Sequence, residues 1–76
     1  MAMYMHKEFL THIQHGNFDA LREPGEQAPD AGIYRCHACG HEIGIAKTHT
    51  LPPQNHHAHQ PGIGRIQWRL VAAAKN

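Results

Sequence analysis

The sequence predicts a small α+β domain stabilised by a bound metal ion, with a short N-terminal helix and then a three-stranded antiparallel sheet. Three observations lead to this prediction. In a chain of 76 residues, the free energy gained by burying apolar surface exceeds the entropic cost of ordering the chain by only a small margin. Its two cysteines, Cys36 and Cys39, are separated by only two residues. Six of its nine histidines lie in the 24 residues that begin at Cys36.

The first 22 residues are predicted to be a helical segment. Met5, Phe9 and Ile13 recur at intervals of four, which places them along one side of a helix over residues 4–15. Gly16 follows as the left-handed residue that ends such a helix. We expect the apolar stripe to belong to the core or to form a docking face.

Residues 23–32 separate this helix from the rest of the chain. They contain two prolines and two glycines, which interrupt regular structure. We therefore expect one domain over residues 1–76, with a helical segment at 1–22, a linker at 23–32 and a metal-binding module at 33–71.

Three short segments have the composition of β-strands. Residues 33–35 begin with a β-branched and an aromatic residue, and residues 43–45 alternate apolar residues with glycine. The two segments are predicted to pair as an antiparallel hairpin with the cysteines at its tip. Residues 65–71 alternate, with Ile66, Trp68 and Leu70 on one face. This segment is the third strand, with Trp68 in the core. The intervening prolines and histidines of residues 48–64 predict a long loop.

The cysteine spacing is that of a metal-binding turn. Two thiolates three positions apart can both reach one tetrahedral ion at about 2.3 Å, and Gly40 permits the left-handed backbone that such a turn needs. The pattern aromatic-x-Cys-x-x-Cys-Gly of residues 34–40 resembles the first cysteine turn of zinc ribbons and rubredoxins. The resemblance covers residues 33–70 and implies a zinc-ribbon sheet, a fold used most often to contact nucleic acids or proteins.

The second half of the site departs from the zinc-ribbon pattern. Where a ribbon has another Cys-x-x-Cys after a Pro-Pro pair, residues 52–53 of this chain are followed by a histidine cluster. His56 and His59 form a His-x-x-His pattern, which has the same spacing as the Cys-x-x-Cys that a ribbon has here. The predicted ligands of one Zn²⁺ per chain are Cys36, Cys39, His56 and His59. His57 and His49 are the alternative ligands, and His57 with His59 can also present two nitrogens to one ion.

Other interpretations of the cysteine pair agree less well with its surroundings. A thioredoxin-type redox pair needs a helix that begins at the cysteines, but Gly40 and Gly44 follow them. Haem attachment requires histidine at position 40, and rubredoxin-like iron requires four thiolates. If both cysteines were merely buried thiols, the small core would lack a further source of stability. We expect His37 and His41 to be exposed, or to contact the ligands from beside them, rather than to bind the ion.

The charge and composition of the chain also argue against several classes of function. A net charge of +1 supplies no long-range field for nucleic acid, and no apolar run approaches the roughly 20 residues of a membrane span. The first ten residues lack the features of a secretory signal, so we expect a cytoplasmic protein. The chain contains no serine nucleophile.

These observations favour a non-enzymatic zinc-binding module whose structural Cys₂His₂ site holds the fold. We expect a protein partner, with nucleic acid as the second choice and no membrane. One alternative is a metal carrier or buffer that uses the histidine-rich loop. Another is a small zinc enzyme, in which Glu42 is the acid–base candidate and water takes the fourth position on the ion.

Overall fold

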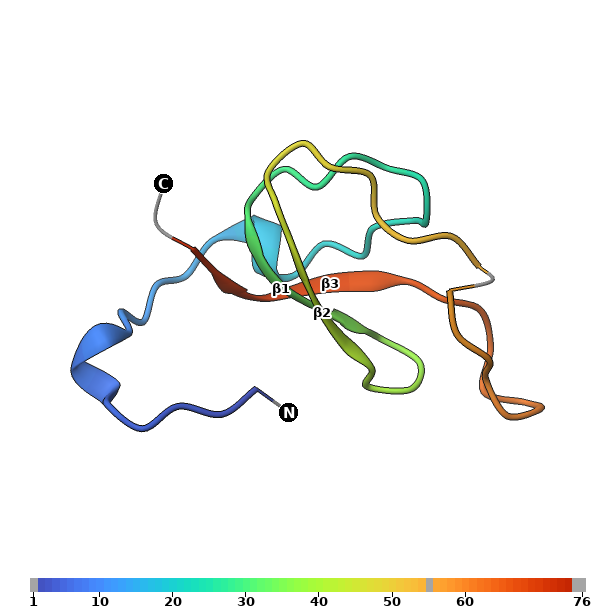
Figure 1. The fold of residues 1–76 in the computed structure, drawn as a ribbon, viewed down its shortest axis with the longest axis horizontal. Coiled ribbons are helices and arrows are strands. Elements are labelled where there is room, and N and C mark those ends of the chain that lie inside the picture. The colour runs from blue at the N-terminus through green and yellow to red at the C-terminus, as the bar shows by residue number, and fades with distance from the viewer. Residues whose placement is uncertain (1, 55, 75–76) are drawn as a thin grey trace.

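The computed structural model describes residues 2–54 and 56–74 of the chain (Figure 1). Two short 3-10 turns precede three β-strands. The elements are η1 (Lys7–Phe9), η2 (Gly16–Phe18), β1 (Gly32–Cys36), β2 (Glu42–Ile45) and β3 (Trp68–Ala73).

The strands form one antiparallel sheet in the order β2-β1-β3. Tyr34 of the central strand β1 lies opposite Ile43 of β2 and Leu70 of β3, which confirms the predicted three-stranded arrangement. Gly32 begins β1 with a φ of 151°, and a Cβ at this position would collide with the backbone of Ala72. Only glycine allows β3 to approach β1 this closely.

The third strand begins three residues later than the sequence predicts. The side-chain amide of Gln54 accepts a hydrogen bond from the Ile66 N–H (2.9 Å) and donates one to the Ile66 carbonyl (3.1 Å). Gln54 therefore takes the place of a neighbouring strand at Ile66. Ile66 is fully buried although it lies outside the strand.

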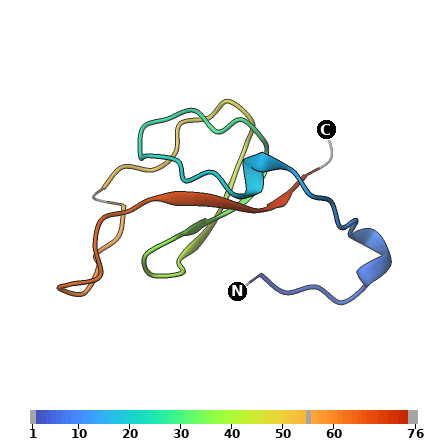
Figure 2. The same ribbon diagram turned by 180° about the vertical axis from the view of Figure 1, so that it is seen from behind.

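The core lies between one face of the sheet and two loop segments that pair with each other above it (Figures 1 and 2). The Ala28 N–H donates to the carbonyl of His49 (2.9 Å), and Gln27 and Thr50 form an isolated antiparallel bridge. Ala28 is itself fully buried, so the segment at 23–32 contributes to the core as well as connecting its flanking parts. The buried residues are Ala28, Tyr34, Cys36, Leu51, Ile66, Trp68 and Leu70.

The predicted N-terminal helix is wrong. Residues 4–15 contain only the three-residue turn η1, and this segment extends away from the sheet (Figure 1). Met5, Phe9 and Ile13 are 87%, 80% and 55% exposed, so the described part of the chain covers too little of the apolar stripe to hold it helical. Isolated helices shorter than about 12–15 residues are marginal in water, because most helical stability in proteins comes from tertiary packing. No helix in the described part of the chain is long and apolar enough to cross a membrane.

Candidate metal centre

The two cysteines lie at the tip of the β1–β2 hairpin. Cys36 is the last residue of β1 and is fully buried, whereas Cys39 lies in the turn and is exposed. The turn is closed by the Gly40 N–H, which donates to the Cys36 carbonyl (2.8 Å), and by the Cys36 N–H, which donates to the His41 carbonyl (2.7 Å). Gly40 adopts the expected left-handed conformation with a φ of 83°. This backbone brings both sulfur atoms to one side of the hairpin tip.

The histidine-rich loop returns to the same end of the sheet as the hairpin tip (Figure 1). A turn begins where the His56 N–H donates to the Pro53 carbonyl (2.9 Å). Gln54 fastens the loop to Ile66, close to the start of β3. The buried indole of Trp68 lies beneath the loop and donates its N–H to the Pro52 carbonyl (3.1 Å). The loop is thus anchored on both sides of its histidines.

Four side chains from these two segments converge. His59 Nε2 lies 3.3 Å from the sulfur of Cys36, and His57 Nε2 lies 3.2 Å from the sulfur of Cys39. The two Nε2 atoms are 3.0 Å apart. The donor atoms of all four residues lie within 4.8 Å of one another. We refer to Cys36, Cys39, His57 and His59 as the thiolate–imidazole site.

The distances fit a tetrahedral ion. Zinc binds sulfur at about 2.3 Å and imidazole nitrogen at about 2.0–2.1 Å, so neighbouring sulfur and nitrogen ligands lie about 3.5 Å apart and two nitrogens about 3.3 Å apart. The three contacts of 3.3, 3.2 and 3.0 Å are each within about 0.4 Å of these separations. A small outward movement of the side chains accommodates an ion. The residues present therefore fit zinc in both chemistry and spacing.

The orientation of each imidazole leaves a lone pair directed at this centre. His59 Nδ1 lies 2.6 Å from the Gly64 carbonyl, which can only accept, so Nδ1 carries the proton and Nε2 the lone pair. His57 Nδ1 lies 2.9 Å from His56 Nδ1. When His57 Nε2 binds an ion, its Nδ1–H donates to His56. Metal-binding histidines almost always donate their other ring N–H in this way.

The environment of Cys36 favours the thiolate. Burial raises the pKa of this thiol, but four hydrogen-bond donors outweigh burial and the pKa is lowered overall. The donors are the backbone amides of Cys39, Ala38 and Gln67 and the side chain of Cys39. The thiolate is the form of cysteine that binds metal ions.

The two imidazoles have opposite pKa shifts. Burial, followed by the charges of three neighbouring histidines, lowers the pKa of His57 and favours its neutral form. The hydrogen bond to the Gly64 carbonyl raises the pKa of His59, burial opposes this effect, and Cys36 adds to the increase. Protons therefore compete with a bound ion at His59 before they compete at His57.

The structure places the predicted site residues in two neighbouring groups. Cys36, Cys39 and His59 come together as proposed from the sequence, but the fourth donor beside them is His57. His56 instead lies in a second group with His41 and His57, and His49 is exposed and belongs to neither group among the described residues. Which histidines bind an ion stays a prediction. His41 is exposed, as expected from the sequence, but no sequence signal indicated that it lies beside His56 and His57.

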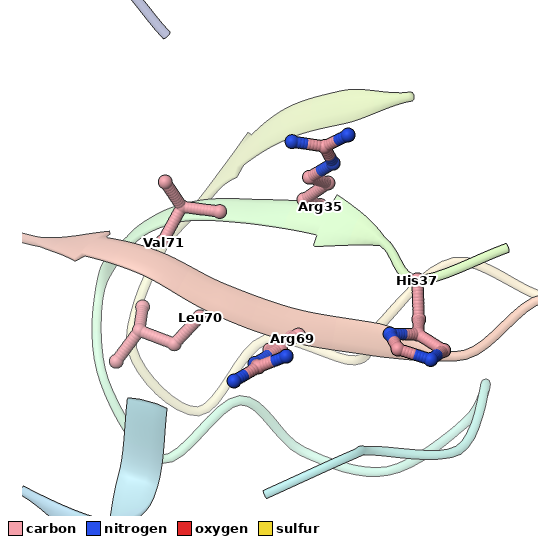
Figure 3. A pocket seen from close by; sticks show the side chains of 5 residues that line it. All are labelled: Arg35, His37, Arg69, Leu70 and Val71. Atoms are coloured by element: carbon pink, nitrogen blue, oxygen red, sulfur yellow. The ribbon is translucent and has the colours of Figure 1, made fainter. Parts of the chain in front are cut away.

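A separate hollow of about 340 Å³ lies on the sheet (Figure 3). Arg35 and Arg69 are directly opposed on β1 and β3, and His37 lies at the end of the hollow. Figure 3 shows the two guanidinium groups pointing to different sides of the strands. Arg69 donates from Nε to the Phe18 carbonyl (2.9 Å) and lies 3.5 Å from Asp19 Oδ1. Part of the positive charge near this hollow is therefore already paired within the protein.

Comparison with known proteins leaves the family open. No protein-family model matches this chain, and no solved structure matches it. The chain is similar to a curated Escherichia coli protein named Protein L, with 46% identity over 48 residues, which cover 63% of this chain and 54% of that protein. The chain thus spans about half the length of the curated relative that it matches. The name of that relative states no activity.

Proposed function

We propose that this protein is a zinc-ribbon-like binding module in which one structural zinc ion joins the β1–β2 hairpin tip to the histidine-rich loop. The observation that carries the proposal is the convergence of two sulfur and two imidazole donors within 4.8 Å. Cysteine and histidine together, in a four-coordinate arrangement, are the donor set of structural zinc sites. Bound zinc would fix the histidine-rich loop to the hairpin tip of the sheet. Without the ion, hydrogen bonds connect the loop to the sheet.

The donor count favours a structural role over a catalytic one. Structural zinc sites take all four ligands from the protein, whereas catalytic sites leave one position for water or substrate. Cys36, Cys39, His57 and His59 would fill all four positions. We therefore propose that the protein is not an enzyme and that its function depends on the surface which the ion holds in place. Because thiols stay reduced there, the cytoplasm is the compartment that suits this site.

The core is small enough for the ion to decide whether the chain folds. Seven apolar side chains are buried among the described residues. Structural zinc supplies an apparent binding energy of about 10–16 kcal/mol in small modules, and a chain of this length has an expected stability of about 4–11 kcal/mol. Removal of the ion is therefore expected to unfold the sheet.

The test combines metal analysis with a measurement of folding. Native mass spectrometry and elemental analysis of the reduced full chain are expected to return one zinc ion per chain. Amide proton dispersion in an NMR spectrum is expected to collapse when a strong chelator is added and to return when zinc is restored. Cys36→Ser is expected to show the collapsed spectrum even with zinc, whereas the matched change His49→Ala keeps the native spectrum. Native dispersion of Cys36→Ser without metal would refute the proposal.

We also propose that the partner is a protein rather than a nucleic acid. Arg65 lies 2.9 Å from Glu23, and Arg69 lies 3.5 Å from Asp19, so these two arginines have carboxylates beside them. With a net charge of +1, little positive charge is left to contact phosphates. Fluorescence anisotropy with labelled DNA and RNA tests this choice. Binding at physiological salt that weakens steeply as salt is added would refute it.

A further inference from the structure

A second group of donors lies beside the thiolate–imidazole site. One donor atom from each of His41, His56 and His57 lies within 4.8 Å of the other two. The His41 ring stacks on the His57 ring with centroids 4.5 Å apart and planes inclined by 25°. The His56 ring meets both of them edge-on, at 5.3 Å from His41 and 5.1 Å from His57. We refer to these three residues as the histidine trio.

The trio is accessible to an ion from solvent. His41 and His56 are exposed and His57 is half-buried. His41 follows the cysteine turn, whereas His56 and His57 belong to the loop, so the trio spans the same two segments as the thiolate–imidazole site. An ion bound here keeps open positions for water, because three donors of the described residues face it.

The donor set of the trio indicates which ions it suits. His56 Nδ1 and His57 Nδ1 are 2.9 Å apart, close enough for two nitrogens to bind one ion at about 2.0–2.1 Å. The trio offers nitrogen donors and no sulfur, whereas the thiolate–imidazole site offers both. Sets of nitrogen and oxygen ligands, here imidazoles and water, are typical of Ni²⁺ and Cu²⁺.

We propose that the histidine trio is a second metal site, selective for an imidazole-binding divalent ion of the nickel or copper type, and that it shares the His57 ring with the zinc site. The inference rests on the proposed function, because His57 Nε2 is directed at the cysteines while Nδ1 is directed at His56. The second ion takes the place of the proton on His57 Nδ1, and this proton passes to solvent. His41 and His56 complete the site, and of these two only His56 also supports the first site, through its contact with His57 Nδ1.

Trp68 reports on this site without a label. It is the one tryptophan of the chain, and its ring lies 5.7 Å from the His56 ring and 5.9 Å from the His57 ring. A paramagnetic ion at the trio is therefore expected to quench its fluorescence. Zinc has a filled d shell, so zinc loading of the first site does not mask this signal.

The experiment is a titration of the zinc-loaded, reduced full chain with Ni²⁺, followed by dialysis and elemental analysis. We expect one nickel and one zinc ion per chain, quenched Trp68 fluorescence, and no absorption from sulfur-to-nickel charge transfer. His41→Ala is expected to weaken nickel binding at least about tenfold while zinc is retained, and His56→Ala is expected to weaken nickel binding at least as much. The matched change His37→Ala, which removes an exposed histidine that lines the hollow with Arg35 and Arg69 and belongs to neither group of donors, is expected to leave nickel binding unchanged.

His41→Ala separates the two sites cleanly. His41 contributes only its backbone carbonyl to the cysteine turn, and this group is kept in the variant. If nickel displaces zinc one for one, or if both trio variants bind nickel as the parent does, the second site is refuted. A zinc-loaded chain that takes no nickel refutes the second site alone. A reconstituted chain that holds no zinc before nickel is added refutes the proposed function and, with it, the shared ligand.

Discussion

Replacement of His57 by alanine is expected to weaken zinc binding more than replacement of its neighbour His56. His57 Nε2 lies 3.2 Å from the sulfur of Cys39 and 3.0 Å from His59 Nε2, so His57→Ala removes a donor from the centre of the site. On the side of the His57 ring away from the cysteines, His56 Nδ1 lies 2.9 Å from His57 Nδ1. His56→Ala therefore removes the hydrogen-bond acceptor that orients the His57 ring. The two changes therefore remove different parts of one arrangement.

The size of each decrease in zinc affinity follows from the usual binding energy of structural zinc and from the role of each histidine in the structure. An apparent binding energy of about 10–16 kcal/mol shared among four ligands amounts to about 2.5–4 kcal/mol for each. Loss of His57 therefore corresponds to a decrease of on the order of 10²–10³-fold in zinc affinity. Loss of an orienting hydrogen-bond partner typically costs roughly 10–100-fold. We expect His59→Ala to resemble His57→Ala, because His59 Nε2 lies 3.3 Å from the Cys36 sulfur.

Competition for zinc with a chromogenic chelator of known affinity measures these decreases. Far-UV circular dichroism at saturating zinc checks that each variant still folds. The exposed His49, which lies in the same half of the chain and outside both groups of donors, provides the control His49→Ala. An equal or larger loss in His56→Ala than in His57→Ala would refute the assignment of His57. The ligand pair would then be His56 and His59, as the sequence spacing suggests.

Three further expectations concern the core and pH. Leu51→Ala removes a fully buried side chain and is expected to lower the free energy of unfolding by about 2–5 kcal/mol, measured by denaturant titration at saturating zinc. Burial raises the pKa of Tyr34, so the folded state holds this proton more tightly. Stability is then complete below about pH 10 and falls as pH rises beyond it, a decrease that should be absent in Tyr34→Phe. Acid should release zinc, with protonation of His59 before His57 because the pKa of His59 is raised and that of His57 lowered, and a zinc indicator follows the release. Retention of zinc where free imidazole is fully protonated would exclude these two histidines as ligands.

The features that depend on short spacings along the chain were predictable from sequence. Cys36 and Cys39 are three positions apart, and a tight turn closed by a left-handed glycine, as at Gly40, can bring their sulfurs to the same side. The alternation of Ile66, Trp68 and Leu70 predicted a half-buried segment, and all three side chains are buried. Local covalent geometry and the two-residue period of a strand are sufficient for both inferences.

The tertiary structure alone decided three other features. Met5, Phe9 and Ile13 have the spacing of a helix, but the described residues leave more than half of each side chain exposed, and a helix this short needs packing. Ala28 lies in a segment whose prolines and glycines resemble a linker, yet pairing with residues 48–51 buries it. Which of His56 and His57 lies beside the cysteines depends on how the loop turns after Pro53 and on where Cys39 lies. These contacts join residues far apart in sequence, so no local spacing determines them.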